Sequence, residues 1–446
     1  MTTSIFRASA MALVLATTTG CVLAPSGTSE ERLRAERAGT PWEHPFPERT
    51  LPELPLTPTW QQVLTRAFLA NGELEASYLD WRTALDRIDQ AAAYPNTNVS
   101  LGYERMFSGG NLKGWDRTTI SVGFDPMQNL SFPTKVMAAG RVAFEEAQAS
   151  GLSFEMAKFD LQRRVLTAWL DLVLAAERVR LQREQLALLT IVADTAGTNV
   201  AAGSAQGEIL DAELAYAQGE DALRRLEAEV PQRRATLNGL LARSGDAPLE
   251  PPATLPDPRS LPTSDAQLLA LAVDRSPELA ALAHEVAGRD DALDFAWQQW
   301  IPDINPFAGF EGSMSQVAGL MASLPARVPM IQGAIREARH MLQRAEATAR
   351  QTRHERAASF VATLTALRES ERQTTFLRDR LGPIAAQAVA AARDRYVAGT
   401  LKMPDLVAAE RMVVDVQLLL AEARIARETR LAELEALAGV DMETLS

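Results

Sequence analysis

The chain has 446 residues, of which 47% are hydrophobic, so it is long enough for two or three domains with a large core. Its formal net charge of −12 argues against a nucleic-acid-binding protein, because phosphate backbones select basic surfaces. Aromatic residues make up only 6%, and alanine, leucine, glutamate and arginine dominate, a composition typical of long helices and coiled coils.

The first residues have the pattern of an export signal. Arg7 gives a positive start, residues 8–16 are apolar, and small residues follow up to Cys21, the only cysteine. The apolar run is shorter than the roughly 20 residues that a membrane-spanning helix needs. We therefore predict a signal peptide over residues 1–20, and we expect no disulfide within the chain.

Residues 18–21 (TTGC) resemble a bacterial lipobox, in which the cysteine becomes the lipid-carrying first residue after cleavage. Val22, where some lipoproteins carry aspartate, fits a lipoprotein of the outer membrane. The alternative is a plain secretory signal that is followed by an incidental cysteine. We predict lipid attachment at Cys21.

Residues 21–58 are polar and then rich in proline, so we predict an extended tether, because proline is not tolerated inside a helix. A second proline cluster predicts a linker over residues 248–263. It separates two similar parts, repeat 1 at 59–247 and repeat 2 at 264–440, and residues 441–446 form a short tail.

The two parts are a duplication. Each is about 190 residues long, too long for a solenoid unit of about 20–50 residues. Three motifs recur in the same order, 205, 207 and 197 residues apart: 71–76 with 276–281, 94–96 with 301–303, and 209–213 with 406–410.

Repeat 1 begins with a predicted helix over residues 60–93, which Pro95 ends. Residues 97–105 and 118–124 alternate strictly between apolar and small or polar side chains, which predicts two strands. Apolar residues then recur at heptad spacing over residues 145–200 and again from Ile209 onward, after a glycine-rich turn. This pattern predicts an antiparallel coiled-coil hairpin, with a kink at the proline near the far end of its return helix.

Repeat 2 follows the same plan. We predict a helix over 265–300, strands over 303–311 and 316–324, and a long helix over 332–397 that is broken near Gly382 and Pro383. The return helix carries heptads from Leu406 onward. The second pair of strands is weaker, because Pro306 interrupts one strand and Phe307 falls on its polar side.

Four amphipathic strands of about nine residues match the tilted span of an outer membrane. Four strands cannot close into a barrel, because the smallest barrels have about eight, and an open sheet edge is not stable in lipid. The strands therefore form either a soluble sheet beside a periplasmic helical bundle or a barrel shared between protomers. A symmetric oligomer would also bury the remaining heptad seams.

In order and spacing these motifs resemble the TolC-like outer membrane efflux protein family, over nearly all of residues 58–440. The resemblance rests on the duplication, on residues 275–279 (RSPEL), on the proline before each strand pair, and on 396–399 (YVAG) followed by 405–410 (DLVAAE). It implies a mainly α fold with a small β part, in which duplicated helical hairpins build an α-helical coiled-coil barrel. Four strands per chain would contribute to a shared transmembrane β-barrel. The implied assembly is a homotrimer that works with a periplasmic adaptor protein and an inner-membrane pump.

The resemblance also assigns candidate site residues. Asp405 matches a family aspartate that faces the closing pore at the periplasmic tip, whereas Ala408 stands where a second family aspartate would be. Glu208 and Asp211 are the corresponding acids of repeat 1. Three copies of such an acid would form a cation-attracting ring, although acids in a first helical turn are also favoured by the helix dipole alone. The turns expected to dock the adaptor contain Gly203, Ser204, Gly399 and Thr400.

No enzyme, metal site or cofactor is expected. His340 and His354 lie 14 residues apart on one predicted helix, about 21 Å by helical rise, so they cannot share a metal ion. No phosphate-binding loop and no nucleophile–base pair is present. We therefore predict a passive outer-membrane exit duct of a tripartite efflux system. The alternative is a lipid-anchored coiled-coil scaffold or adaptor without a pore.

Overall fold

The computed structural model describes residues 22–94, 99–107, 115–124, 130–200, 206–252, 254–259, 261, 264–311 and 315–441. These residues form mainly helices and one four-stranded antiparallel sheet, which confirms the predicted mainly α fold with a small β part. The chain divides into two compact units. Unit 1 comprises residues 1–40, 77–154 and 278–353, and unit 2 comprises 41–76, 155–277 and 354–446, so each unit contains parts of both repeats.

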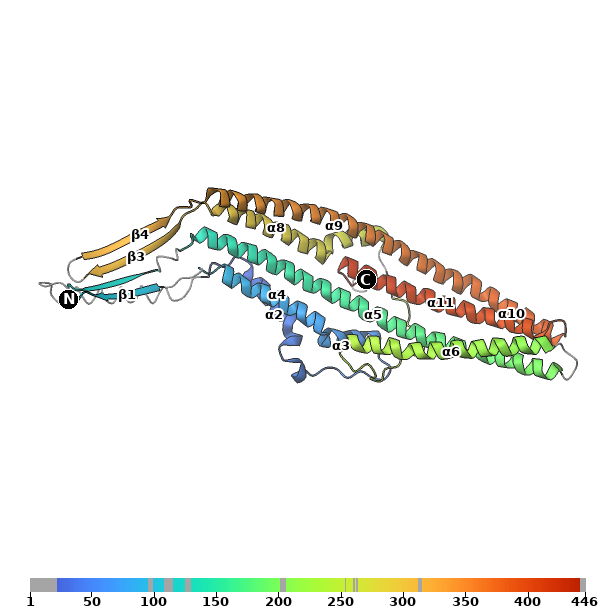
Figure 1. The fold of residues 1–446 in the computed structure, drawn as a ribbon. Helices are drawn as coiled ribbons and strands as arrows, with labels where there is room; N and C mark the ends of the chain where they lie inside the picture. The colour runs from blue at the N-terminus through green and yellow to red at the C-terminus, as the bar shows by residue number, and fades with distance from the viewer. Residues whose placement is uncertain are drawn as a thin grey trace. The chain divides into compact units, whose positions relative to one another are not determined.

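The sheet of unit 1 has the order β1-β2-β3-β4, as Figure 1 shows. Its strands are β1 (Val99–Arg105), β2 (Thr118–Phe124), β3 (Asp303–Glu311) and β4 (Ser315–Ser323). The bounds of β2 and β3 are those predicted, and the other two strands are confirmed to within two residues. β2 belongs to repeat 1 and β3 to repeat 2, so the pairing of β2 with β3 joins the two repeats.

Pro306 does not break β3, contrary to the weakness expected there. The pairing of β2 with β3 runs only as far as Phe307, so Pro306 has a strand neighbour on one side alone, where it lies opposite Leu320. A proline needs no hydrogen-bond acceptor at such a position. Phe307 lies beside Gly123 and Gly319 in the register, and its ring covers Gly319, where a Cβ would come within 2.5 Å of it.

Helices supply most of the described remainder of unit 1. They are α2 (Thr28–Gly39), most of α4 (Gly72–Ala91), most of α8 (Pro277–Gln298), and the first parts of α5 (Pro133–Val200) and α9 (Val328–Phe376). α4 and α5 pack through Trp81, which is 1% exposed and stacks on Phe154 with ring centroids 5.8 Å apart. Gly151 makes this possible, because a Cβ there would come within 2.7 Å of the Trp81 ring.

The prediction of an extended tether over residues 21–58 is wrong for residues 28–39. They form α2, which is held on α4 because Trp81 Nε1 donates to the Glu31 carboxylate at 3.1 Å. The prolines that favoured an extended chain lie only from Pro41 onward, while residues 28–39 contain good helix formers such as glutamate, arginine and alanine. Further along, Arg49 binds Glu75 through two hydrogen bonds of 2.5 and 2.7 Å, so this segment is fixed to the protein.

Unit 2 contains the larger part of the two helical hairpins. The first consists of α5 and α6 (Gln206–Leu240). The second consists of α9, a π-helical turn (Leu377–Leu381), α10 (Gly382–Val397) and α11 (Met403–Ala438). The long helices of both hairpins are confirmed, although α5 begins at Pro133, well before residue 145. The short helices α3 (Trp60–Ala70) and α7 (Asp265–Arg275) complete the unit, and Leu268 of α7 packs with Leu367 and Leu431 in a buried core.

Each of the two helices predicted before the strands is divided by a capping residue. The first is divided at Asn71, which separates α3 from α4, and the second at Ser276, which separates α7 from α8. Asn71 Oδ1 accepts hydrogen bonds from the amides of Glu73 and Leu74, which is the geometry of a helix N-cap. Asn71 Nδ2 also donates to the carbonyl of Leu240, so the cap fixes the end of α6.

The predicted break near Gly382 and Pro383 is a π-helical turn. The Gly382 amide donates to the carbonyl of Leu377, five residues earlier. Pro383 has no amide hydrogen, and its ring excludes the normal helical hydrogen bond at this point, so the helix widens by one residue. Within the described residues, no helix has the length and apolar character needed to cross a membrane.

Candidate functional site

One face of the sheet exposes large apolar side chains. The register places Leu101 opposite Val122 and Tyr103 opposite Ile120, and alternation puts Leu320 of β4 on the same face. Leu101 is 74% exposed, Tyr103 63% and Leu320 63%. Exposed rings and leucines on one sheet face form an apolar patch, which in a folded protein marks contact with lipid or a partner.

The opposite face is small and polar on β1 and β2. Gly102 lies opposite Ser121, and Glu104 opposite Thr119, and the row of Thr119 continues to Glu311 and Ser315. β4 departs from this pattern, because Val317 and Met321 lie on the same side as its serines. The face expected to be hydrophilic is therefore small or polar on β1 and β2, interrupted by Phe307 on β3, and mixed on β4.

Exposed aromatic residues lie at both ends of the strands. Phe107 follows β1 and Trp115 precedes β2 at one end, where they are 89% and 55% exposed. Trp297 and Trp300 precede β3 at the other end, and Phe132 follows β2 there. Two aromatic rows that flank an apolar band are typical of strands that cross a membrane.

The turn between α10 and α11 has a well-defined geometry. Gly399 has φ +70° and Thr400 donates its amide to the carbonyl of Arg395 at 2.9 Å, while the Gly399 amide donates to Tyr396 at 3.0 Å. This pair of bonds is a Schellman motif, which requires a left-handed residue and hence favours glycine. The Thr400 hydroxyl also donates to the Arg395 carbonyl, so both predicted docking residues of this turn are fixed by the helix end.

The structure places the predicted gate acids separately. Asp405 is exposed in the first turn of α11, and Asp211 is exposed near the start of α6. Among the described residues, neither carboxylate has an ion pair or a hydrogen bond. Glu208 lies in α6, but its side chain is outside the described part.

Three further predicted sites, Cys21, Gly203 and Ser204, also lie outside the described residues. The gate and adaptor-docking assignments therefore stay predictions.

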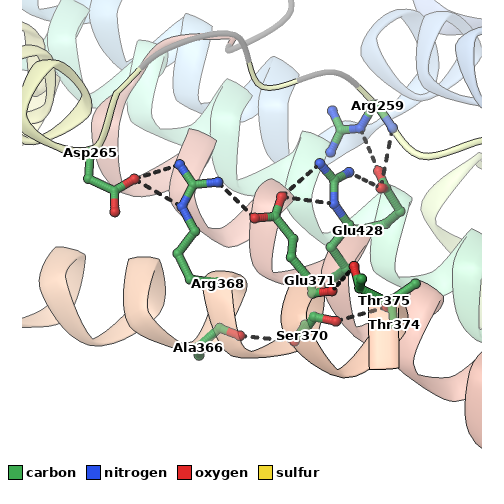
Figure 2. Close-up of polar contacts among 10 residues, drawn as sticks. Arg259, Asp265, Ala366, Arg368, Ser370, Glu371, Thr374, Thr375 and Glu428 are labelled. Carbon is green, nitrogen blue, oxygen red and sulfur yellow. Dashed lines mark hydrogen bonds and ion pairs between the residues drawn. The ribbon is translucent and has the colours of Figure 1, made fainter. Parts of the chain in front are cut away.

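A network of buried ion pairs, which the sequence did not indicate, crosses unit 2 (Figure 2). Arg259 of the predicted linker donates to the carboxylates of Glu428 and Glu435 on α11, at 3.0 Å each. Glu435 is 1% exposed and Glu428 6%. Burial of the Arg259 guanidinium would lower its pKa, but the carboxylates of Glu435 and Glu428 more than offset this effect, so the pKa of Arg259 is raised.

The same network continues to α9 and α7. Arg427 binds Glu428 and donates to Glu371 of α9 at 3.1 Å. Arg368 then links Glu371, at 2.7 Å, to Asp265 at the start of α7, at 2.5 Å. Figure 2 shows this chain of alternating charges from Arg259 to Asp265. It holds the linker and three helices of unit 2 together.

Local patterns carry little signal for this network. Glu428 and Glu435 are seven residues apart within an apolar heptad, which is unusual for carboxylates, and this spacing is the one available sign. Their partner Arg259 lies 169 and 176 residues away in sequence. In the described part of the chain, no group of three histidine, cysteine, aspartate or glutamate side chains could hold a metal ion.

The described chain thus has two long helical hairpins and a small sheet whose apolar face is exposed. Residues 268–440 match the model of the family described as outer membrane efflux protein. Among curated proteins, none matches the sequence. The resemblance to the TolC-like outer membrane efflux protein family is thus confirmed.

Solved structures extend the likeness to most of the chain. The outer membrane protein VceC of Vibrio cholerae is 17% identical, with a TM-score of 0.68, over 85% of this chain and 96% of that one. A membrane protein of Pseudomonas aeruginosa is 18% identical, with a TM-score of 0.71, over 88% and 97%. The MtrE outer membrane channel of Neisseria gonorrhoeae, solved in an open state, is 17% identical, with a TM-score of 0.67, over 88% and 93%.

Proposed function

We propose that three copies of this chain form a passive exit duct in the outer membrane of a Gram-negative bacterium. The observation that carries the proposal is the sheet face with exposed Leu101, Tyr103 and Leu320, because such a face is stable only when lipid or protein covers it. The aromatic rows at both ends of the strands fit the two interfaces of a bilayer. Small and polar side chains on the other face suit a water-filled lumen.

The proposed trimer follows from the two free edges of the sheet. β1 and β4 each pair on one side only within the described chain. A sheet edge in lipid leaves backbone groups unsatisfied, so β4 of one copy must pair with β1 of the next. Three chains of four strands would close a twelve-stranded barrel, and the two helical hairpins of each chain would together form a periplasmic tunnel of twelve helices.

The position of residue 23 supports the proposed lipid anchor. The Leu23 amide donates to the carbonyl of Ala92 at 2.8 Å, just after α4 and shortly before β1. Cys21 precedes Leu23 by two residues, a reach of at most about 7 Å. A lipid on Cys21 would thus enter the membrane leaflet at the periplasmic end of the strands.

We also propose that Asp405 contributes to a periplasmic gate, with Asp211 and Glu208 as its counterparts in repeat 1. Three exposed carboxylates around a narrow axis attract cations and repel one another. The turns with Gly399 and Thr400, and with Gly203 and Ser204, would bind a periplasmic adaptor. An inner-membrane pump would then supply the energy, because the proposed duct uses no cofactor and catalyses no reaction.

Purification and electrical recording test this function. We expect a heat-sensitive trimer that only detergent extracts from membranes and that conducts ions in planar bilayers. Asp405→Ala should reduce cation selectivity and divalent block, with Asp394→Ala, an acid near the end of α10, as the control. A monomer that high salt releases, without conductance, would instead indicate the scaffold or adaptor without a pore.

A further inference from the structure

Helix α9 carries exposed arginines that lack partners. Arg336, Arg339 and Arg350 are spaced so that they lie within one face of the helix, and all three are exposed. In the described part of the chain, none of these arginines has a hydrogen bond or an ion pair. Arg141 of α5, by contrast, binds Asp291 at 2.6 Å.

Helix α4 exposes an acid that also lacks a partner. Asp86 shares one face of α4 with Leu79, which is 52% exposed. Asp86 makes no ion pair with any described residue, although two neighbours do: Asp89 binds Arg32 at 2.7 Å and Arg87 binds Glu146 at 3.2 Å.

The strand order brings these two faces together in any closed ring. α4 leads into β1, and β4 leads into α9. β1 and β4 are the edge strands, so closure pairs β4 of one copy with β1 of the next. The start of α9 must then lie beside the end of α4 of the neighbouring copy.

Within one chain, the two repeats meet where β2 pairs with β3, and we call this meeting of strands and their helices the joint. It shows how the helices next to two paired strands contact each other. β2 pairs with β3, β2 leads into α5, and β3 follows α8. There, Arg141 of α5 binds Asp291 of α8 at 2.6 Å, and Glu145 of α5 binds His284 of α8 at 2.7 Å. In the Arg141–Asp291 pair the basic group lies on the helix that leaves the sheet and the acid on the helix that enters it, whereas the Glu145–His284 pair has the opposite order.

The helices next to the free edge strands β1 and β4 have the same order of charges as the Arg141–Asp291 pair. Arg141 and Arg336 both lie eight residues after the first residue of their helices, and Asp291 and Asp86 lie seven and five residues before the ends of theirs. We propose that Arg336 and Arg339 form ion pairs with Asp86 of a neighbouring copy, and that these pairs close the joint between subunits below the barrel. The inference rests on the proposed trimeric duct and specifies the surfaces that meet in it.

Cysteine crosslinking in outer-membrane preparations tests the joint directly. The full-length variant with Asp86→Cys and Arg336→Cys, treated with a short bifunctional maleimide, should give covalent dimers and trimers on a denaturing gel. The matched control, Arg141→Cys with Asp291→Cys, should crosslink within one chain and give no larger species. Each single variant and the parent chain, which retains Cys21, set the background.

Charge reversal tests whether the pairs stabilise the assembly. Arg336→Asp with Arg339→Asp should lower the ratio of trimer to monomer in detergent about tenfold, because like charges then meet at three joints. Adding Asp86→Arg to this variant should restore the ratio, whereas Asp86→Arg alone should lower it.

The outcomes separate this inference from the proposed function. Trimers that conduct, but that neither crosslink at positions 86 and 336 nor respond to charge reversal, would overturn the joint and leave the duct intact. A chain that is monomeric in membranes before any substitution would overturn both. Crosslinked trimers with charge-dependent stability would support both.

Discussion

At the scale of single residues, Arg259 is the most consequential side chain of unit 2. It lies in a proline-rich linker, yet it neutralises two carboxylates of α11 that are almost fully buried. A buried charge is costly unless an opposite charge accompanies it. The linker is thus a structural part of the helical core, because its Arg259 forms an ion pair with Glu435 at 3.0 Å.

Arg259→Ala should therefore destabilise the protein strongly. We expect a loss of about 3–5 kcal/mol in the free energy of unfolding, because Glu435 would stay buried without its partner. Chemical denaturation followed by circular dichroism measures this loss. The control is Arg372→Ala, which removes an exposed pair on one helix and should change nothing measurable. Equal stability of both variants would show that the buried network contributes little.

Glu75 gives a pH dependence. The hydrogen bonds from Arg49 lower the pKa of Glu75, and burial opposes this more weakly. A lowered pKa in the folded state means that the stabilisation is fully present above the unfolded value of about 4.3 and is lost as the pH falls through the folded pKa. The difference in melting temperature between the parent and Glu75→Gln should thus be constant from pH 7 to 5 and should shrink at lower pH.

At the scale of elements, the caps at Asn71 and Ser276 divide helices that look continuous in sequence. Apolar periodicity runs through both positions, and a break of one residue changes it too little to be seen. In both repeats a capping residue is followed by glycine or proline and then by glutamate, and this recurrence is the feature of the sequence that indicates the break. The error at α2 has a similar cause. The prolines of residues 41–58 led to the prediction of an extended chain, although residues 28–39 are rich in helix-forming residues.

Asn71→Ala should cost about 1–3 kcal/mol in the free energy of unfolding. It removes two hydrogen bonds at the start of α4 and one to the end of α6. Asn71→Asp keeps the acceptor for the helix amides and loses only the bond to Leu240, so its cost should be smaller. If both variants were equally stable, the cap would not be the reason for the break.

At the scale of the whole molecule, the sequence was most informative about the sheet and the duplication. Period-two alternation is visible without tertiary contacts, so β2 and β3 were predicted at their observed bounds. The buried part of the network could not be predicted, because Arg259 meets Glu428 and Glu435 across 169 and 176 residues of sequence. The gate acids were assigned by resemblance, and their geometry in an assembly depends on other chains.

The two faces of the sheet should respond differently to charge. Leu101→Arg places a cation on the apolar face, at a cost of about 2–4 kcal/mol if it lies near the bilayer midplane, so little folded protein should reach the membrane. Thr119→Arg places the same cation on the opposite face, between Glu104 and Glu311 in the register, and should be inserted normally. Heat-modifiable mobility of membrane fractions reports insertion, and equal loss in both variants would contradict the assignment of the faces.

The pairing of β2 with β3 has a consequence for how such a gene can change. In the proposed ring, the joint inside each chain and the joint between chains have the same construction, so the ring itself does not distinguish covalent from non-covalent neighbours. A gene that encodes one repeat could in principle build the ring from six copies. Fusion of two repeats then allows each repeat to diverge separately. The two helices that leave the sheet differ in this way: α5 carries Glu145, which binds His284, whereas α9 carries the exposed arginines Arg336 and Arg339.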